Sequence, residues 1–557
     1  MKKSRLFVVV LVTVATACTG SGSGGGGSAG PSGTIKEGGF LRIAAYDFID
    51  SMNPYVGFNN DTYSTFQMIY PYLVQYDVET LEFIPEFAQS WQTSEDGLTW
   101  TFHTVPNAKW SDGTPLTAKD AAFTINMEIK YKDDATSSAA GSIANMTSAE
   151  ATDDNTLVIQ YAKQIPMVLA NLQQTAILPE HVWSPLATGD GKAIRTYPNV
   201  PEDGKPLVCG GPFVLTEFQQ DAVALFEKNP NYYGTPPHID GFGLQLFSND
   251  DAEITALKNG EIDAIESVPV TAVQTLQDAG IEVFTGPATA ERDFIINSDP
   301  EKTSHRELLN PLVRQAFEHA IDRQSVVETA WLGFASPATT FVPPATGDWH
   351  DTSVQGLPFD IDQANALLDQ AGYPVGADDI RTGEDGPMSY EVIFPRSERG
   401  SGDRAFQIIQ ADFLKIGVKL TQVPMGDGAA WGEIIKDDYT AFDLAMWNWT
   451  PPIDPDFVLS ILTCAQLAPA GAWNDSGYCD DEFDSLYEAQ GTEMDAQKRL
   501  DIVYEMQQKI LDDRPYIMIT YDMTIDAWSP NWTGFIESVQ GFYGSLSNQS
   551  MISVHQV

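Results

Sequence analysis

Three tryptophans, Trp431, Trp447 and Trp449, lie within one short stretch of the chain, just before Pro451 and Pro452. Indole faces stack on sugar rings and apolar side chains, and the indole N–H can donate a hydrogen bond to a ligand. For each tryptophan alone, burial in an ordinary core is an equally good interpretation. Together with the adjacent Thr450, the three predict a ligand-binding surface.

The chain offers no comparable set of reacting groups. Its seven histidines are scattered, and no pair has the spacing of a zinc site on a helix. Two short motif matches within residues 20–30 consist of Gly, Ser and Ala and lack the flanking strand and helix that a nucleotide or nucleophile motif needs. The sequence has no P-loop, and its carboxylates are too many for a glycosidase pair to be chosen. We therefore expect a protein that is not an enzyme and has no cofactor or metal; a surface hydrolase is an alternative.

The first residues predict export. Three basic residues precede a short apolar run, 6–14, which is too short to span a bilayer as a stable helix. Small residues then lead into Cys18, and the pattern resembles the lipobox of bacterial lipoproteins, whose cysteine is acylated, although Ala15 replaces the usual leucine. Residues 19–34 are Gly, Ser, Ala, Thr and Pro, a composition typical of a flexible tether. We expect a signal peptide over 1–18 and a lipid anchor at Cys18; an ordinary secretory signal with a chance cysteine is the alternative.

Charge and cysteine content restrict the partners further. The formal net charge of −46 over 557 residues repels nucleic acid and anionic lipid, so we expect no nucleic-acid partner. Solubility is a sufficient explanation of this acidity. In an exported protein, Cys464 and Cys479 are close enough in sequence to predict a disulfide, which leaves Cys209 as a buried thiol.

Strands and helices alternate along the chain beyond the tether. Residues 98–102 alternate apolar and polar side chains, as a half-buried strand does. Helices are predicted from apolar spacing and from capping or glycine signals in six places: from 117, and over 251–259, 311–327, 362–370, 404–416 and 499–511. The pattern predicts a mixed α/β fold with more than one core.

Seven motifs, in order along the chain, resemble those of the extracytoplasmic solute-binding proteins of ABC importers, family 5, the peptide- and nickel-binding class. One of them, residues 110–120, reads WSDGTPLTAKD and is highly specific. The others lie at 86–102, 210–213, 229–233, 256–264, 313–323 and 364–373. The resemblance covers nearly the whole mature chain and includes dipeptide- and oligopeptide-binding members.

The resemblance implies a two-lobe clamp like that of periplasmic binding proteins (type II, cluster C), with an extra domain in the first lobe. It implies a lobe one made of residues 35–71, 195–285 and 525–557, an extra domain at 72–194, and a lobe two at 286–524. Family members capture a solute between the lobes and deliver it to a membrane permease. We expect a monomer at the outer face of the cell membrane, periplasmic in a Gram-negative cell, that captures an oligopeptide or a peptide-like solute. An oligosaccharide ligand, or a peptide-sensing or chaperone-like receptor without transport, is the alternative.

The resemblance also bears on individual residues. Trp431 matches a position that lines the cleft, and Cys464 and Cys479 match a paired-cysteine position of dipeptide-binding members. Peptide-binding members carry an aspartate that pairs with the peptide ammonium where this chain has Pro451 or Pro452, depending on the alignment. A buried ammonium without a counter-charge costs several kcal/mol, which disfavours a free peptide N-terminus there. Arg404 lies in a region that places side chains near the far end of the ligand, where it can meet a carboxylate; a solvated surface is the alternative.

Overall fold

The computed structural model describes residues 35–557 apart from 46–48, 58–59, 79, 133–139, 144, 248, 377, 437–438, 441, 469–472 and 537–546. The expected signal peptide, Cys18 and the tether lie outside the described residues. Within the described ranges, no helix is both long enough and apolar enough to cross a membrane. The expected mixed α/β architecture is confirmed.

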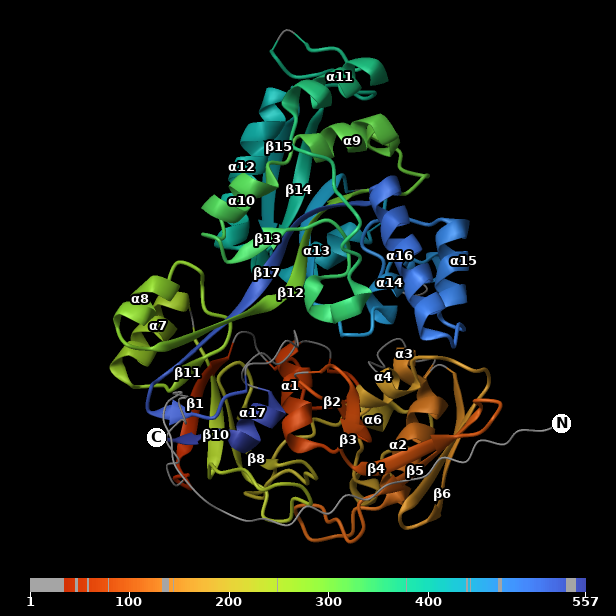
Figure 1. Ribbon diagram of the computed structural model, residues 1–557, viewed down its shortest axis with the longest axis vertical. Coiled ribbons are helices and arrows are strands. Elements are labelled where there is room, and N and C mark those ends of the chain that lie inside the picture. The colour runs from red at the N-terminus through yellow and green to blue at the C-terminus, as the bar shows by residue number, and fades with distance from the viewer. Residues whose placement is uncertain are drawn as a thin grey trace, which may run out of the picture. The chain divides into compact units, whose positions relative to one another are not determined.

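The largest sheet has eleven strands and joins segments from distant parts of the sequence. Its order is β15-β14-β16-β12-β17-β11-β1-β10-β9-β8, and β13 (Ala335–Pro337) pairs with β17. At its centre lie β12 (Glu282–Ile296) and β17 (Tyr516–Trp528), an antiparallel pair of long strands. Figure 1 shows these two strands side by side, passing from the elements around β14 to those around β1.

Before β12, the chain contributes strands to the eleven-stranded sheet and forms a four-stranded and a two-stranded sheet of its own. The eleven-stranded sheet takes from this part β1 (Phe40–Ala45), β8 (Phe213–Gln219), β9 (Val223–Lys228), β10 (Gly241–Leu246) and β11 (Ala264–Ile265). A separate antiparallel sheet, in the order β4-β5-β7-β6, consists of β4 (Ala88–Thr93), β5 (Thr99–Thr104), β6 (Met146–Asp153) and β7 (Thr156–Tyr161). Helix α2 (Ala118–Tyr131) packs on β6 and β7. One buried core includes residues from both sheets, such as Phe102 and Phe226.

The remaining elements before β12 are short. They are α1 (Asn60–Ile69), β2 (Val74–Tyr76), β3 (Phe83–Pro85), α3 (Ala140–Ile143), α4 (Val168–Gln173), α5 (Glu180–Trp183), α6 (Lys192–Arg195), α7 (Asp250–Asn259) and α8 (Val273–Asp278). After β17 the chain adds β18 (Trp532–Thr533), α17 (Asn548–Ser553) and β19 (His555–Gln556).

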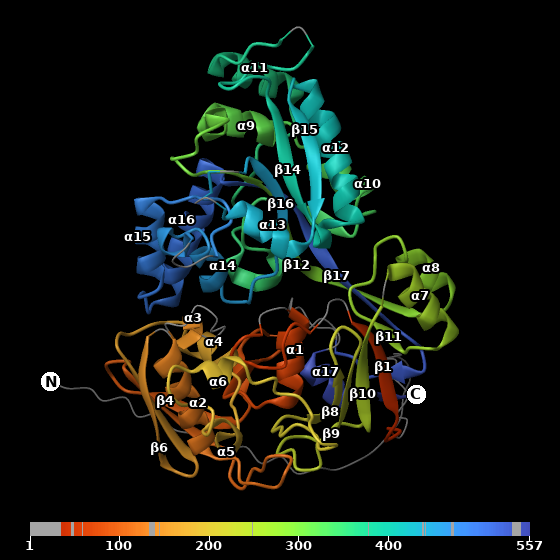
Figure 2. The ribbon, with the colours of Figure 1, turned by 180° about the vertical axis from the view of Figure 1, so that it is seen from behind.

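Between β12 and β17, the chain completes the sheet and covers both of its faces. The strands here are β14 (Ser389–Pro395), β15 (Lys419–Met425) and β16 (Leu444–Trp449). The helices are α9 (Pro311–His319), α10 (Arg323–Thr329), α11 (Ile361–Ala371), α12 (Ser401–Lys415), α13 (Asp427–Ile434), α14 (Asp456–Ser460), α15 (Asp481–Gln490) and α16 (Ala496–Asp513), with 3-10 turns at Arg306–Leu309, Pro344–Trp349, Arg396–Glu398 and Cys464–Gln466. Figure 2 shows α12 beside β15, and α15 beside α16.

The alternation of side chains on β12 divides this part into two cores. Phe294 and Ile296 belong to the core that includes α9, α11 and α12, whereas Ile295 belongs to the core that includes α13 and α16. Because successive residues of a strand point to opposite faces, both faces of β12 are buried.

Local capping rules explain several helix ends. Thr117 and Asp120 form a reciprocal capping box at the start of α2. Gly260 and Gly372 follow α7 and α11 in the left-handed region, with φ of +72° and +90°, which glycine adopts without Cβ strain. The single helix expected over 311–327 is wrong: α9 and α10 are separate. The Asp322 side chain accepts a hydrogen bond from the Ser325 amide at 3.0 Å and so caps a new helix.

Candidate ligand-binding site

The structure brings the three predicted tryptophans into one aromatic cluster. The ring centroid of Trp431, on α13, lies 5.8 Å from that of Trp447 and 6.4 Å from that of Trp449. Trp473 and Phe457 complete the cluster, because the Trp473 ring lies 6.3 Å from Trp431 and 5.8 Å from Phe457. We use "aromatic cluster" for these five residues. Sequence reasoning missed Trp473 and Phe457.

The cluster is held by β16, which lies inside the large sheet between β14 and β12, and by hydrogen bonding. Trp447 and Trp449 are two residues apart on β16 and therefore point to the same face of the sheet. Trp431 contacts them from α13. The Trp449 indole N–H donates to Asp475 Oδ2 at 3.0 Å, and the Tyr516 hydroxyl donates to the other oxygen of the same carboxylate. Asp475 thus fixes the plane of Trp449.

The cluster is only partly covered. Trp473 is 40% exposed, while Trp431, Trp447 and Trp449 are half-buried. Rings that pack edge to face leave indole faces that can stack on sugar rings or apolar side chains. Thr450, which follows Trp449 directly, is also half-buried and offers a hydroxyl beside the cluster.

The acidic residues that follow the prolines already have partners. Asp454 makes a bidentate ion pair with Arg499, at 2.7 Å for each oxygen. Asp456 accepts a hydrogen bond from the Gln490 amide at 2.6 Å. Pro451 is buried, and neither Pro451 nor Pro452 can pair with a cation. These two carboxylates therefore provide no free counter-charge for an ammonium group next to the aromatic cluster.

Residues on β2 approach the same ion pair from a distant part of the sequence. Burial is the main cause that raises the pKa of the Tyr76 hydroxyl, the nearby Asp454 carboxylate raises it further, and Arg499 lowers it. The end of β2 thus lies next to the turn between β16 and α14.

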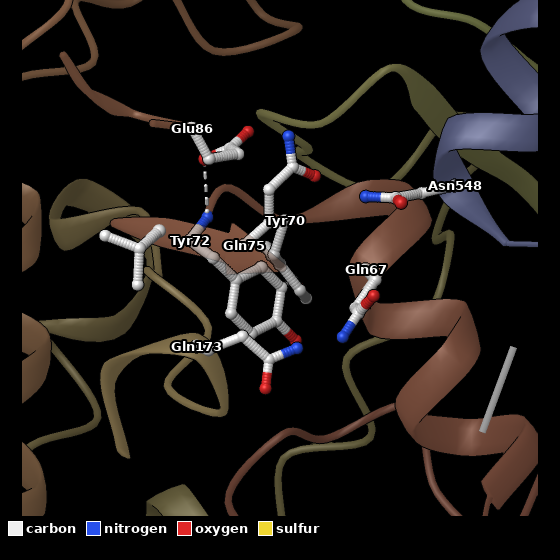
Figure 3. A pocket seen from close by; sticks show the side chains of 8 residues that line it. Gln67, Tyr70, Tyr72, Gln75, Glu86, Gln173 and Asn548 are labelled. Atoms are coloured by element: carbon white, nitrogen blue, oxygen red, sulfur yellow. Dashed lines mark hydrogen bonds between the residues drawn. The ribbon is translucent and has the colours of Figure 1, made fainter. Parts of the chain in front are cut away.

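A small polar hollow lies along β2. It is lined by Gln67, Tyr70, Tyr72, Val74, Gln75, Glu86, Gln173 and Asn548. Figure 3 shows the four amide side chains around this hollow, and the hydrogen bond from the Tyr72 amide to Glu86. Burial raises the pKa of Glu86 to about 7, opposed by hydrogen bonds from the Tyr233 hydroxyl at 2.5 Å and the Tyr72 amide at 2.9 Å. The hollow is lined mainly by polar side chains and has room for a water-sized group.

Arg404 has a different environment from the tryptophans. It lies on α12, and its guanidinium donates to the Ala330 carbonyl at 2.7 and 3.1 Å and to the Ser401 hydroxyl at 2.8 Å. These bonds fasten α12 to the end of α10. The structure does not bring Arg404 together with the aromatic cluster, so we leave it out of the candidate site.

The described cysteines form one disulfide and one buried thiol. Cys464 and Cys479 form a disulfide, and Cys209 is a buried free thiol whose pKa burial raises to about 12. The disulfide closes the loop that carries Trp473 and Asp475. Among the described residues, no group of three His, Cys, Asp or Glu side chains is arranged to hold a metal ion.

Comparison with known proteins gives consistent matches over most of the chain. The sequence profile of "Bacterial extracellular solute-binding proteins, family 5 Middle" matches residues 82–467. Protein XP55 of Streptomyces lividans is 26% identical over 498 residues, covering 88% of this chain and 85% of that protein. The dipeptide-binding protein of Escherichia coli (strain K12) is 23% identical over 511 residues, covering 87% and 90% of the two chains.

Solved structures share the same fold. The oligopeptide-binding protein AppA from Bacillus subtilis, in complex with a nonapeptide, matches with a TM-score of 0.80 at 20% identity, covering 94% of this chain and all of that one. NikZ from Campylobacter jejuni, in complex with Ni(L-His), matches with a TM-score of 0.78 at 21% identity, covering 93% and 99%. The expected two-lobe α/β fold is confirmed.

Proposed function

Because the chain belongs to the bacterial extracellular solute-binding proteins of family 5, we propose that it captures an oligopeptide or peptide-like solute between its two lobes and delivers it to an ABC permease. Its relatives bind solutes and are not enzymes. Solute binding and release, rather than covalent chemistry, is the step that this chain performs.

The observation that carries the proposal is the aromatic cluster. Five aromatic rings from α13, β16, α14 and the loop before Cys479 gather on one face, and Trp473 remains substantially exposed. Exposed aromatic residues that cluster this way are typical of ligand contacts rather than of a finished core.

The charge distribution favours a second ligand class. Two prolines occupy the position where a counter-charge is expected, and Asp454 is committed to Arg499. A solute without an ammonium group at this point, such as an oligosaccharide, avoids an uncompensated buried charge. Oligosaccharide is therefore the alternative to a peptide whose backbone or side chains meet the cluster.

Thermal unfolding of the purified mature chain against peptide and oligosaccharide libraries separates these ligands. A solute at about one hundred times its dissociation constant stabilises the fold by about 2.7 kcal/mol, which raises the melting temperature measurably. We expect a shift with members of one library. If neither library shifts the melting temperature, the proposed ligand classes are wrong.

We also propose that Cys18 carries a lipid that holds the protein at the outer face of the cell membrane. The apolar run and the small residues before Cys18 support this anchor. Cys18→Ser should move the protein from the membrane fraction to the soluble extracytoplasmic fraction after carbonate washing. Retention of the variant on membranes to the same extent as the wild type would contradict the anchor.

A further inference from the structure

Two acidic side chains lie inside the sheet directly beneath the aromatic cluster. Glu291 and Asp293 are two residues apart on β12, so their side chains point to the same face, and both are completely buried. Their partners across the antiparallel ladder are Trp449 and Trp447. Because directly paired residues share a face, both carboxyl groups lie on the face that carries these tryptophans.

Neither carboxyl group has a hydrogen-bond donor among the described residues. All four of their oxygens are buried and unpaired. A buried carboxylate without a donor or a cation is strongly unfavourable. This pair therefore needs an explanation that ordinary packing does not give.

The neighbouring charged groups do not stabilise ionised forms of Glu291 and Asp293. Asp475 lies on the same side and adds a third carboxyl group, with the Tyr516 hydroxyl and the Trp449 indole as its donors. Arg292 is the nearest cation, but alternation places it on the opposite face of β12. There it pairs with Glu398 and with Asp522, the latter at 2.8 Å. One guanidinium thus already serves two carboxylates.

The electrostatics of the pair point to a bound proton. Burial, followed by the neighbouring carboxylates, raises the pKa of Glu291 and of Asp293 well above the usual range. A protonated carboxyl group is neutral, so a bound proton removes the cost of a buried charge that has no donor or cation beside it.

We propose that Glu291 and Asp293 form a proton-binding site, which retains at least one proton at neutral pH and braces the sheet face under Trp447 and Trp449. The site is independent of the proposed function; its effect on solute capture rests on that function. Loss of the proton places two like charges side by side in the core and loosens the face that carries the aromatic cluster.

The sign of the pH dependence follows from the direction of the shifts. The folded state binds the proton more tightly than the unfolded chain does, because the folded pKa values are raised. The stabilisation is therefore complete below the unfolded values near pH 4 and is lost as the pH rises through the folded values. Asp475, whose pKa burial raises to about 6, and Glu86, at about 7, contribute in the same direction, so a comparison of variants is needed.

Glu291→Gln tests the site, because glutamine keeps the shape and supplies a permanent donor to Asp293. We expect the urea midpoint of the wild type to fall between about pH 5 and about pH 9. For Glu291→Gln, we expect the urea midpoint to fall by less than half as much over the same pH range. Glu282→Gln, at an exposed position of the same strand, is the matched control and should follow the wild-type profile. Parallel profiles for Glu291→Gln and the wild type would overturn the proposal.

Infrared spectroscopy of the wild type keeps the test independent of variant folding. The carbonyl stretch of protonated carboxylic acids should be present at pH 7 and should lose intensity in Glu291→Gln or, if that variant does not fold, in Asp293→Asn; the intensity that remains comes from other buried carboxyl groups such as Glu86 and Glu253. Absence of this band from the wild type at pH 7 would overturn the proposal. A midpoint raised by added sodium or potassium at fixed ionic strength, without the band, would assign the site to a cation instead.

Discussion

Trp431→Ala should weaken solute binding at least 30-fold, which corresponds to about 2 kcal/mol, the loss expected for a central aromatic contact. Trp431 touches Trp447, Trp449 and Trp473, so its removal takes away one indole face and loosens the others. Because Trp431 is only half-buried, the variant should remain folded. Isothermal titration calorimetry with a solute identified by the thermal screen measures the loss.

Trp91→Ala is the matched control. Trp91 is also half-buried, but it lies on β4 and packs against Phe102, away from the aromatic cluster. We expect this control to bind the solute with wild-type affinity although it loses a similar amount of aromatic surface. An unchanged dissociation constant in Trp431→Ala would remove Trp431 from the site. Equal weakening in both variants would attribute the loss to general destabilisation.

Arg499→Ala should destabilise the protein by about 3–5 kcal/mol, because it leaves Asp454 largely buried without its cation. The guanidinium also donates hydrogen bonds of 3.0 and 3.1 Å to the Gln490 side-chain oxygen and lies 4.7 Å from the centre of the Trp349 ring. Its removal therefore breaks a network that joins α15, α16 and the turn after β16. Urea unfolding measures the change as a lower midpoint.

Lys498→Ala, at the exposed neighbouring position of α16, controls for the loss of a positive charge from the same helix. We expect it to change the free energy of unfolding by less than about 0.5 kcal/mol, as is usual for surface substitutions. A double variant, Arg499→Met with Asp454→Leu, should recover much of the stability, because a buried pair replaced by apolar side chains often costs little. A loss below about 1 kcal/mol in Arg499→Ala would show that the pair is not critical for the fold.

Much of the fold could be predicted from local chemistry. Side-chain capping by Thr117 accounts for the start of α2. The left-handed conformation of glycine accounts for the ends of α7 and α11 at Gly260 and Gly372. The break between α9 and α10 was not predicted, because apolar periodicity continues through Asp322 while its side chain caps a new helix. In this case capping overrode the periodic pattern.

The candidate site was only partly predictable. Trp431, Trp447 and Trp449 are close in sequence, but Trp473 joins them through the disulfide-closed loop, which periodicity does not place. From its place in the sequence, Arg404 could have met a ligand carboxylate, whereas in the structure its guanidinium donates to the Ala330 carbonyl. Alternation in a strand normally places acids toward solvent, so Glu291 and Asp293 were not recognised as buried. The signal that could have found them is the apolar run Phe294–Ile296, which indicates a strand covered on both faces.

Small-angle X-ray scattering of the mature chain, with and without a solute found by the thermal screen, tests the central claim most directly. Two lobes that close around a captured solute should give a smaller radius of gyration at saturation, and denaturation should release the solute chemically unchanged. A radius of gyration that stays the same at saturation, or a solute recovered in a converted form, would contradict capture by closure.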